Sequence, residues 1–218
     1  MREALATHDR LVRESLQACG GYEVKTIGDS FMVAFSRAVD AVRFGCVVQT
    51  ALAEEGVMPA GLTRPNADDG FDMLMVRIGV HCGLVDAVRS PVTGRVDYFG
   101  PMVNMAARVE AHGAAGAVTV TPAVMAEIDV ALGDLIAVKY AEARVGKGLQ
   151  DPLWLTALLP RALETRTEHV QMLCGVPASP TAETVTSLER SSDGSNSSVM
   201  SGGISSISTV SSRSGDES

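Results

Sequence analysis

The chain has 218 residues, 46% of them hydrophobic, and a formal net charge of −8; this length and apolar content suffice for one sizeable core. The acidic balance argues against binding to nucleic acid or to an anionic membrane surface, because both need clustered Lys and Arg in excess. The sequence has no apolar run of about 18 residues and no apolar signal-peptide core near residue 1, so we expect it on the cytoplasmic side.

The first part of the chain predicts a helix, a hairpin and a second helix. An amphipathic helix begins almost at residue 1 and ends at Gly20-Gly21. Two short β-prone runs, residues 22–27 and 30–35, are joined through Gly28-Asp29, which is typical of a tight hairpin. Residues 37–56 carry a broad apolar stripe, which predicts a second helix with a wide buried face.

The middle of the chain predicts a loop, a central strand, a second hairpin and a third helix. Residues 56–70 are rich in Gly, Pro, Asn and Asp, as loops are. Residues 73–83 alternate as a central strand does, and residues 84–100 contain a hairpin with its turn near Ser90–Gly94. The helix that follows has Pro101 in its first turn, where proline is tolerated.

The remaining segments complete a layered domain. A strand, a short helix and two further strands run to about residue 160. Hairpins combined with crossover helices favour an α+β fold, an α/β sandwich in which helices cover a mostly antiparallel sheet. We assign residues 1–160 to this domain and residues 161–175 to a C-terminal extension. Residues 176–218 are rich in Ser, Gly and Thr, so we expect a disordered tail.

The cysteines do not indicate a metal site. The four are scattered, without a C-x-x-C pair or a metal-site spacing to any histidine: Cys19, Cys46, Cys82 and Cys174. We interpret them as buried or free thiols in a reducing compartment.

Lys25 and Asp29 are candidates for chemistry because they flank the turn of the first hairpin. A carboxylate at a hairpin tip can bind a hard cation such as magnesium through oxygen. Alternatively, Asp29 hydrogen-bonds its own backbone, as turn aspartates commonly do. Lys25 is either a lysine whose ammonium lies in water or a fixed hydrogen-bond donor in a pocket.

The predicted third helix adds a second polar group. Asn104 and Arg108 are four residues apart and therefore project from one face. An amide and a guanidinium placed this way can orient a hydroxyl and neutralise phosphoryl charge; the alternative is a solvent-facing polar pair. Asp97 precedes the turn into this helix and can reach the same cavity. Lys147, on a Gly-flanked turn, is a candidate phosphate contact, although G-K-G alone is weak evidence.

Four stretches together resemble one family. EVKTIGDSFMVAF, VRIGVHCG, DYFGPMVNMAARVE and KGLQDPLWL occur in the order and approximate spacing of class III adenylyl and guanylyl cyclase catalytic domains. The resemblance covers Met1 to about Leu159, and its most specific part is the G-x-x-V-N-x-A-x-R pattern after an aspartate. The extended loop before VRIGVHCG resembles cyclase domains of the kinetoplastid kind. The implied fold is the ferredoxin-like fold of class III nucleotidyl cyclases.

The resemblance implies a role for each candidate residue. Lys25 and Asp97 would read the adenine edge of ATP, and Lys147 would hold the terminal phosphates. Asn104 would orient the ribose, while Arg108 would stabilise the transition state. The implied reaction is attack of the ribose 3′-hydroxyl on the α-phosphate, which gives cyclic AMP and pyrophosphate with the help of two Mg²⁺ or Mn²⁺ ions.

The chain departs from the family pattern at one point. The family's first metal-binding aspartate lies on a strand ahead of the opening helix, in a stretch resembling F-T-D-I, and this chain begins inside that helix. We therefore expect a sheet without its first strand and a metal site in which Asp29 has lost its partner carboxylate. A single carboxylate would hold the activating metal weakly, so we expect metal affinity and turnover both to fall steeply.

Two function hypotheses follow. The first is an adenylate cyclase catalytic domain that forms a homodimer, where one subunit supplies the metal carboxylates and the other supplies the base-reading and transition-state residues; a longer parent protein would permit membrane anchoring. The alternative is a catalytically impaired cyclase-like module that binds nucleotide or regulates a partner by dimerising. An RNA-binding α/β domain fits the sheet order, but not the acidic charge or the 4% aromatic content.

Overall fold

The computed structural model describes residues 2–56, 74–128, 132, 135–144, 152–174 and 204–212. The first half contains α1 (Arg2–Ala18), β1 (Tyr22–Ile27), β2 (Ser30–Phe35), α2 (Ala38–Glu55), β3 (Met75–Gly83), β4 (Asp86–Arg89) and β5 (Val96–Phe99). The second half contains α3 (Pro101–Ala111), β6 (Val118–Val120), α4 (Pro122–Ile128), β7 (Ile136–Arg144), β8 (Leu153–Pro160), the 3-10 helix η2 (Arg161–Arg166), α5 (Thr167–Cys174) and β9 (Ile204–Ser212). The predicted order of elements is confirmed as far as β8.

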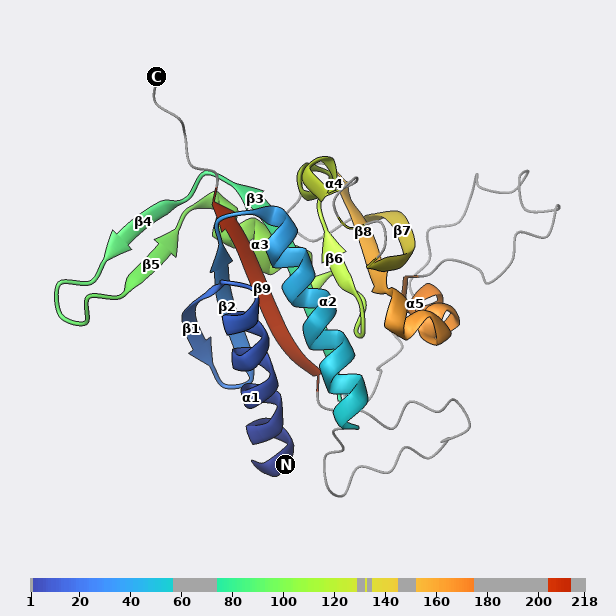
Figure 1. The fold of residues 1–218 in the computed structure, drawn as a ribbon. Helices are drawn as coiled ribbons and strands as arrows, with labels where there is room; N and C mark the ends of the chain where they lie inside the picture. Colours follow the sequence, from blue (N-terminus) through green and yellow to red (C-terminus); the bar gives the residue numbers. More distant parts are fainter. Residues whose placement is uncertain are drawn as a thin grey trace, which may run out of the picture.

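Among the described strands, seven form one sheet in the order β1-β2-β9-β3-β6-β8-β7, and β4 and β5 pair with each other in a second sheet. Helices α1 and α2 lie on one face of the large sheet and α3 lies on the other, as Figure 1 shows. The predicted α+β sandwich is thereby confirmed. The β4–β5 hairpin extends away from the body of the sheet (Figure 1).

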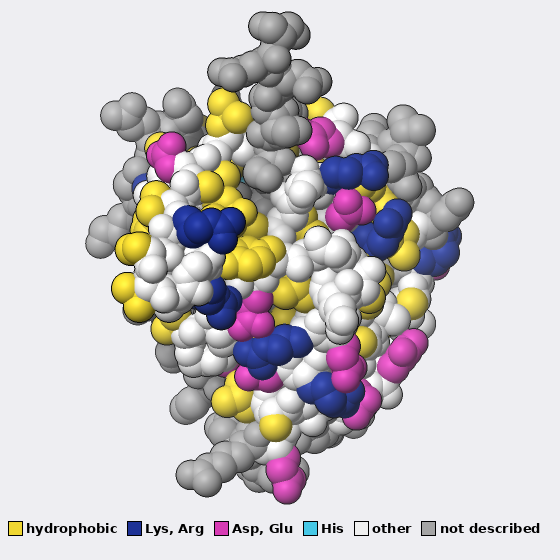
Figure 2. All heavy atoms as spheres, turned by 60° about the vertical axis from the view of Figure 1, so that its left-hand side comes forward, with side chains coloured by type: hydrophobic (Ala, Val, Ile, Leu, Met, Phe, Trp, Pro, Cys, Tyr) yellow, Lys and Arg dark blue, Asp and Glu magenta, His cyan; other side chains and the backbone are white. Residues whose placement is uncertain are grey.

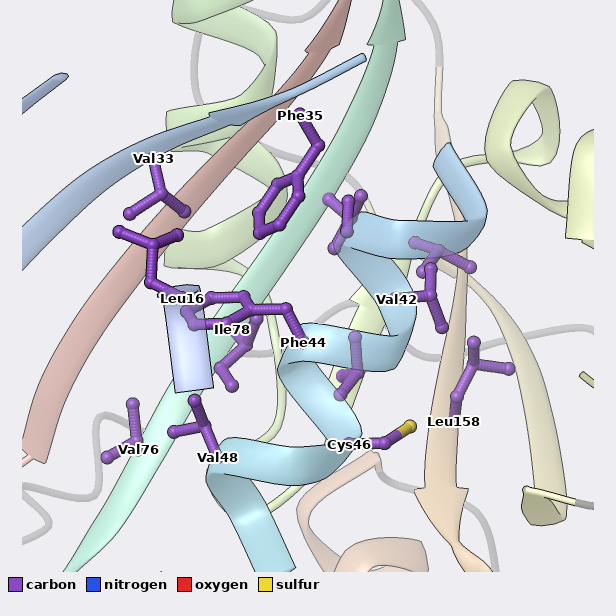
Figure 3. Close-up of a cluster of buried hydrophobic side chains, with 14 of the residues drawn as sticks. Leu16, Val33, Phe35, Val42, Phe44, Cys46, Val48, Val76, Ile78 and Leu158 are labelled. Carbon is purple, nitrogen blue, oxygen red and sulfur yellow. The ribbon is translucent and has the colours of Figure 1, made fainter. Parts of the chain in front are cut away.

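A large apolar core joins the sheet to α1 and α2. Figure 3 shows side chains from these helices, β2 and β3 converging on one cluster that includes Leu16, Val33, Phe35, Phe44, Val48 and Ile78. Arg13 of α1 also donates to both carboxylate oxygens of Glu23 on β1, at 2.9 and 3.2 Å. This bidentate contact holds the pKa of Glu23 below its usual value.

Strand β2 is buried on both faces and therefore belongs to two cores. Phe31, Val33 and Phe35 point into the large core, because side chains alternate along a strand. Met32 and Ala34 face the other way and pack with Ala106 of α3. The strand thus connects the helices of the two layers.

Gly79 sets how closely α3 approaches the sheet. It lies in the middle of β3, and a methyl group there would overlap the backbone of Glu110 on α3. A larger residue would push the helix away from the strand. The glycine in VRIGVHCG is therefore a packing requirement.

Both predicted hairpins are present. Ile27 pairs with Ser30 across Gly28-Asp29, and Gly28 takes a positive φ of 64°, which glycine adopts at little cost. In the second hairpin, the Gly94 amide donates to the Ser90 carbonyl at 2.9 Å. The prediction of a turn at Ser90–Gly94 is confirmed.

Strand β9 was not predicted. The disorder expected for residues 176–218 is wrong for Ile204–Ser212, which pairs in parallel with β2 and with the whole of β3. The sheet joins neighbours in three parallel pairs (β2–β9, β3–β9, β3–β6) and three antiparallel pairs (β1–β2, β6–β8, β7–β8), so it is more evenly mixed than predicted. The central position that the resemblance leaves without a strand is taken by β9.

Some predictions lie outside the described residues. These are most of the loop at residues 56–70, Lys147 with its flanking glycines, and the tail on either side of β9. Among the helices that the structure describes, none has the length and apolar character needed to cross a membrane.

A proline in β9 tests its place in the sheet. Ser208 lies opposite Met32 on β2 and Gly79 on β3, so Ser208→Pro removes a backbone donor from the centre of the sheet. We expect the free energy of unfolding to fall by about 1–3 kcal/mol, measured by chemical denaturation. Ser201→Pro, three residues before the strand, is the control. Equal stability of the two variants would contradict the placement of β9.

Candidate functional site

Lys25 and Asp97 form an ion pair between β1 and β5. The Lys25 ammonium donates to Asp97 Oδ2 at 2.9 Å, across 72 positions of sequence. The two side chains are 38% and 39% exposed, so a ligand can reach them from solvent. Lys25 has three N–H groups, and the pair leaves some of them available.

Two neighbouring contacts hold β5 against β1. The Tyr22 hydroxyl donates to the Val96 carbonyl at 3.2 Å and accepts from the Val96 amide at 3.0 Å. Arg95 donates to the carbonyl of Glu23 at 2.6 Å. Together with the Lys25–Asp97 pair, these contacts form what we term the β1–β5 seam.

The Asp97 carboxylate is fixed by its own strand as well. Its Oδ1 accepts from the Tyr98 amide at 2.9 Å, while Oδ2 accepts from Lys25. The Tyr98 ring packs edge-to-face against Tyr22, with 6.5 Å between the ring centroids. Because both oxygens are engaged, the carboxylate has a defined orientation beside the lysine.

Asn104 and Arg108 lie on the exposed side of α3, one turn apart. The opposite side of the helix is buried through Ala106 and Val109, and this burial fixes which face meets solvent. Within the described residues, no hydrogen bond or ion pair joins this helix pair to Lys25 or Asp97. The structure therefore brings Lys25 and Asp97 together and leaves Asn104 and Arg108 as a separate exposed pair.

Asp29 lies in the β1–β2 turn, and its charge acts on a buried carboxylate that the sequence analysis missed. Glu110 of α3 is 8% exposed and accepts from Arg77 Nε at 2.9 Å. Burial raises the pKa of Glu110; Arg77 opposes that shift and the charge of Asp29 adds to it. The sequence signal for this buried partner was Arg77, the charged residue in the otherwise apolar run VRIGV.

The described residues of one chain do not form a complete metal site. They contain no group of three or more His, Cys, Asp or Glu side chains placed to hold an ion. The Glu110 carboxylate is already paired with Arg77. Asp29 stays the candidate ligand that the family resemblance implies.

Two of the described cysteines, Cys19 and Cys46, lack nucleophilic character. Cys19, Cys46 and Cys82 are free thiols. Burial raises the pKa of Cys46 to about 12 and also raises the pKa of Cys19. Both are protonated at neutral pH, and Cys46 is buried, which agrees with the interpretation of the cysteines as buried or free thiols.

The side of the molecule that carries β1 and the β4–β5 hairpin is mixed in character. Figure 2 shows basic and acidic side chains close together there, with hydrophobic side chains among them. The large apolar residues exposed on these strands and their connections are Ile27, Leu84, Val88, Val92 and Phe99. A ligand at the seam would meet both charge and apolar surface.

Comparison with known proteins identifies the family. The adenylate and guanylate cyclase catalytic domain matches residues 1–149. An adenylate cyclase of Neurospora crassa is 38% identical over 136 residues, which cover 59% of this chain and 6% of the relative. An adenylate cyclase of Podospora anserina is 33% identical over 207 residues, which cover 77% of this chain and 10% of that relative. The chain thus spans a tenth or less of the length of these relatives.

A solved structure shows the same relationship in three dimensions. It is described as an analysis of adenylate cyclases from Trypanosoma brucei in their monomeric state. Its TM-score is 0.61 at 28% sequence identity, and the match covers 72% of this chain and 79% of that one.

Removal of the Tyr22 hydroxyl tests the β1–β5 seam. Tyr22→Phe deletes two hydrogen bonds to Val96 while keeping the ring, so we expect a loss of about 1–2 kcal/mol in the free energy of unfolding. Amide exchange at Val96 should become faster. Tyr98→Phe removes a hydroxyl from the opposing ring and is the control. Unchanged exchange at Val96 in Tyr22→Phe would show that the hydroxyl does not hold the strands together.

Proposed function

Because the chain belongs to the adenylate and guanylate cyclase catalytic domain family, we propose that it converts ATP to 3′,5′-cyclic AMP and pyrophosphate. The observation that carries the choice of ATP is the Lys25–Asp97 ion pair. The greater part of the chain also matches named adenylate cyclases, which supports the same choice. The alternative of an impaired regulatory module is not favoured by these matches.

The ion pair suits the edge of adenine. That edge presents an amino group, which donates, next to a ring nitrogen, which accepts. Lys25 offers N–H donors and Asp97 offers an acceptor at the same place. When ATP binds, the ammonium would donate to the ring nitrogen and the carboxylate would accept from the amino group.

The exposed pair on α3 suits the sugar and the phosphates. We assign Asn104 to the ribose and Arg108 to the charge that develops at the α-phosphate, where a guanidinium can bind two oxygens. In the reaction, a bond forms between the 3′-oxygen and the α-phosphorus. The bond from that phosphorus to the pyrophosphate oxygen breaks, and the hydroxyl proton passes to solvent water. Lys147 would hold the terminal phosphates.

Metal binding is part of the proposal. Two divalent ions, Mg²⁺ or Mn²⁺, would lower the pKa of the 3′-hydroxyl and screen the leaving charge. Asp29 is the residue that we assign to them. Since the described residues hold no group of three or more ligating side chains, we expect weak metal affinity and a higher activity with Mn²⁺ than with Mg²⁺.

Two copies of the chain would complete the sites. We propose a homodimer in which Asp29 of one subunit faces the Lys25–Asp97 pair and Arg108 of the other. A two-fold axis then gives two equivalent sites.

A cyclase assay tests the proposed activity. The full chain with ATP and Mn²⁺ should form cyclic AMP, and Arg108→Ala should lower kcat by about 10²–10³-fold, as loss of a transition-state donor does. Arg43→Ala is the matched control, because Arg43 is an exposed arginine on α2, on the opposite face of the sheet. A wild-type chain that forms no cyclic AMP would contradict the proposal.

Mixing of two inactive variants tests the shared site. Asp29→Ala and Arg108→Ala should each be nearly inactive alone. At equal mixing, half of the dimers contain one of each, and every such dimer has one intact site, so about a quarter of the wild-type activity should return. Cyclic AMP formation after co-refolding measures this. Absence of any rescue, with both variants folded and dimeric, would place all the residues in one subunit.

A further inference from the structure

Phe99 contacts the ammonium of the proposed base site. Its ring centroid lies 5.6 Å from Lys25 Nζ, within the range of a cation–π interaction. The same ammonium donates to Asp97 at 2.9 Å. Lys25 is therefore held from two directions, by a carboxylate and by an aromatic face.

Both groups come from one side of β5. Asp97 and Phe99 are two residues apart on this strand, so their side chains project from the same face. Tyr98 projects from the other face and packs on Tyr22. The strand thus separates its anchoring ring from the ring that meets Lys25.

Phe99 is also 49% exposed. Burial of apolar surface does not explain its position, since half of the side chain remains in contact with solvent. The specific interaction described for its ring is the cation–π contact with the Lys25 ammonium.

We propose that Phe99 is a positioning residue for Lys25, and that it sets the preference of this site for adenine over guanine. The proposal rests on the proposed function of the Lys25–Asp97 pair. The ring attracts the ammonium and limits its rotation about the long side chain. The N–H groups not used on Asp97 are then directed to the purine edge, which lowers the ordering cost when the base binds.

The test compares three variants of the full chain by steady-state kinetics with ATP and with GTP. Phe99→Leu keeps an apolar side chain and removes the ring, so KM for ATP should rise by about 2- to 5-fold, with kcat retained. The ratio of kcat/KM for ATP to that for GTP should fall by a similar factor. Phe99→Tyr keeps an aromatic ring, so KM for ATP and the ATP-to-GTP ratio should both stay at their wild-type values. Val92→Ala, which shortens the most exposed apolar side chain of the same hairpin, is the control.

A double variant tells whether Phe99 acts through Lys25. In the Lys25→Met background, Phe99→Leu should cause no further change in KM for ATP, because the ammonium that the ring would hold is gone. Independent, additive effects would overturn the proposal. An unchanged ATP-to-GTP ratio in Phe99→Leu, or weaker self-association measured by sedimentation, would also overturn it and assign the ring to another contact.

Equilibrium binding separates this inference from the proposed reaction. If the wild-type chain binds ATP but forms no cyclic AMP, the proposed activity fails, and the inference is judged by calorimetry with ATP. The Kd should then rise by about 2- to 5-fold in Phe99→Leu, and an equal Kd would overturn the inference. If the wild-type chain does not bind ATP, both fail.

Discussion

The attachment of β5 to β1 is the constraint on which the base site depends. In the described part of the chain, β4 and β5 pair with each other, and their hairpin extends from the body of the domain. Side chains at the β1–β5 seam join it to the sheet, where Tyr22 and Arg95 bind backbone groups of the opposite strand. In this arrangement Asp97 lies within hydrogen-bond distance of Lys25.

A second constraint acts where α3 packs on β3. Gly79 lets the helix approach β3 closely, and the Arg77–Glu110 pair, at 2.9 Å, binds the same two elements. Because Ala106 and Val109 must be buried, the rotation of the helix is fixed. Asn104 and Arg108 then face outward as a consequence of packing, whatever ligand they bind.

Local patterns predicted the elements well because each has a clear physical signature. Apolar periodicity and the glycines at the turns located both helices of the first layer and both hairpins. The contact between Lys25 and Asp97 spans 72 residues, and no local pattern fixes such a distance; the family resemblance brought the two together. Glu110 was missed because a single acidic residue on a helix is ordinarily a solvated one.

Strand β9 was missed for a different reason. Composition reports whether side chains can form a core, and a segment rich in serine cannot do so alone. A strand between two others obtains its hydrogen bonds from both neighbours, and this gain depends on the backbone rather than on the side chains. Low hydrophobicity is therefore a poor guide wherever a sheet offers two open edges to one segment.

The opening hairpin carries two charges whose surroundings differ. Lys25 lies on β1 and pairs with Asp97 across the β1–β5 seam. Asp29 lies four residues on, in the turn, where its charge acts on Glu110 of α3. The strand directs the lysine to one side, while the turn frees the aspartate to face another. One short hairpin can thus serve two separate sites, and a two-fold arrangement of chains would use both of its ends.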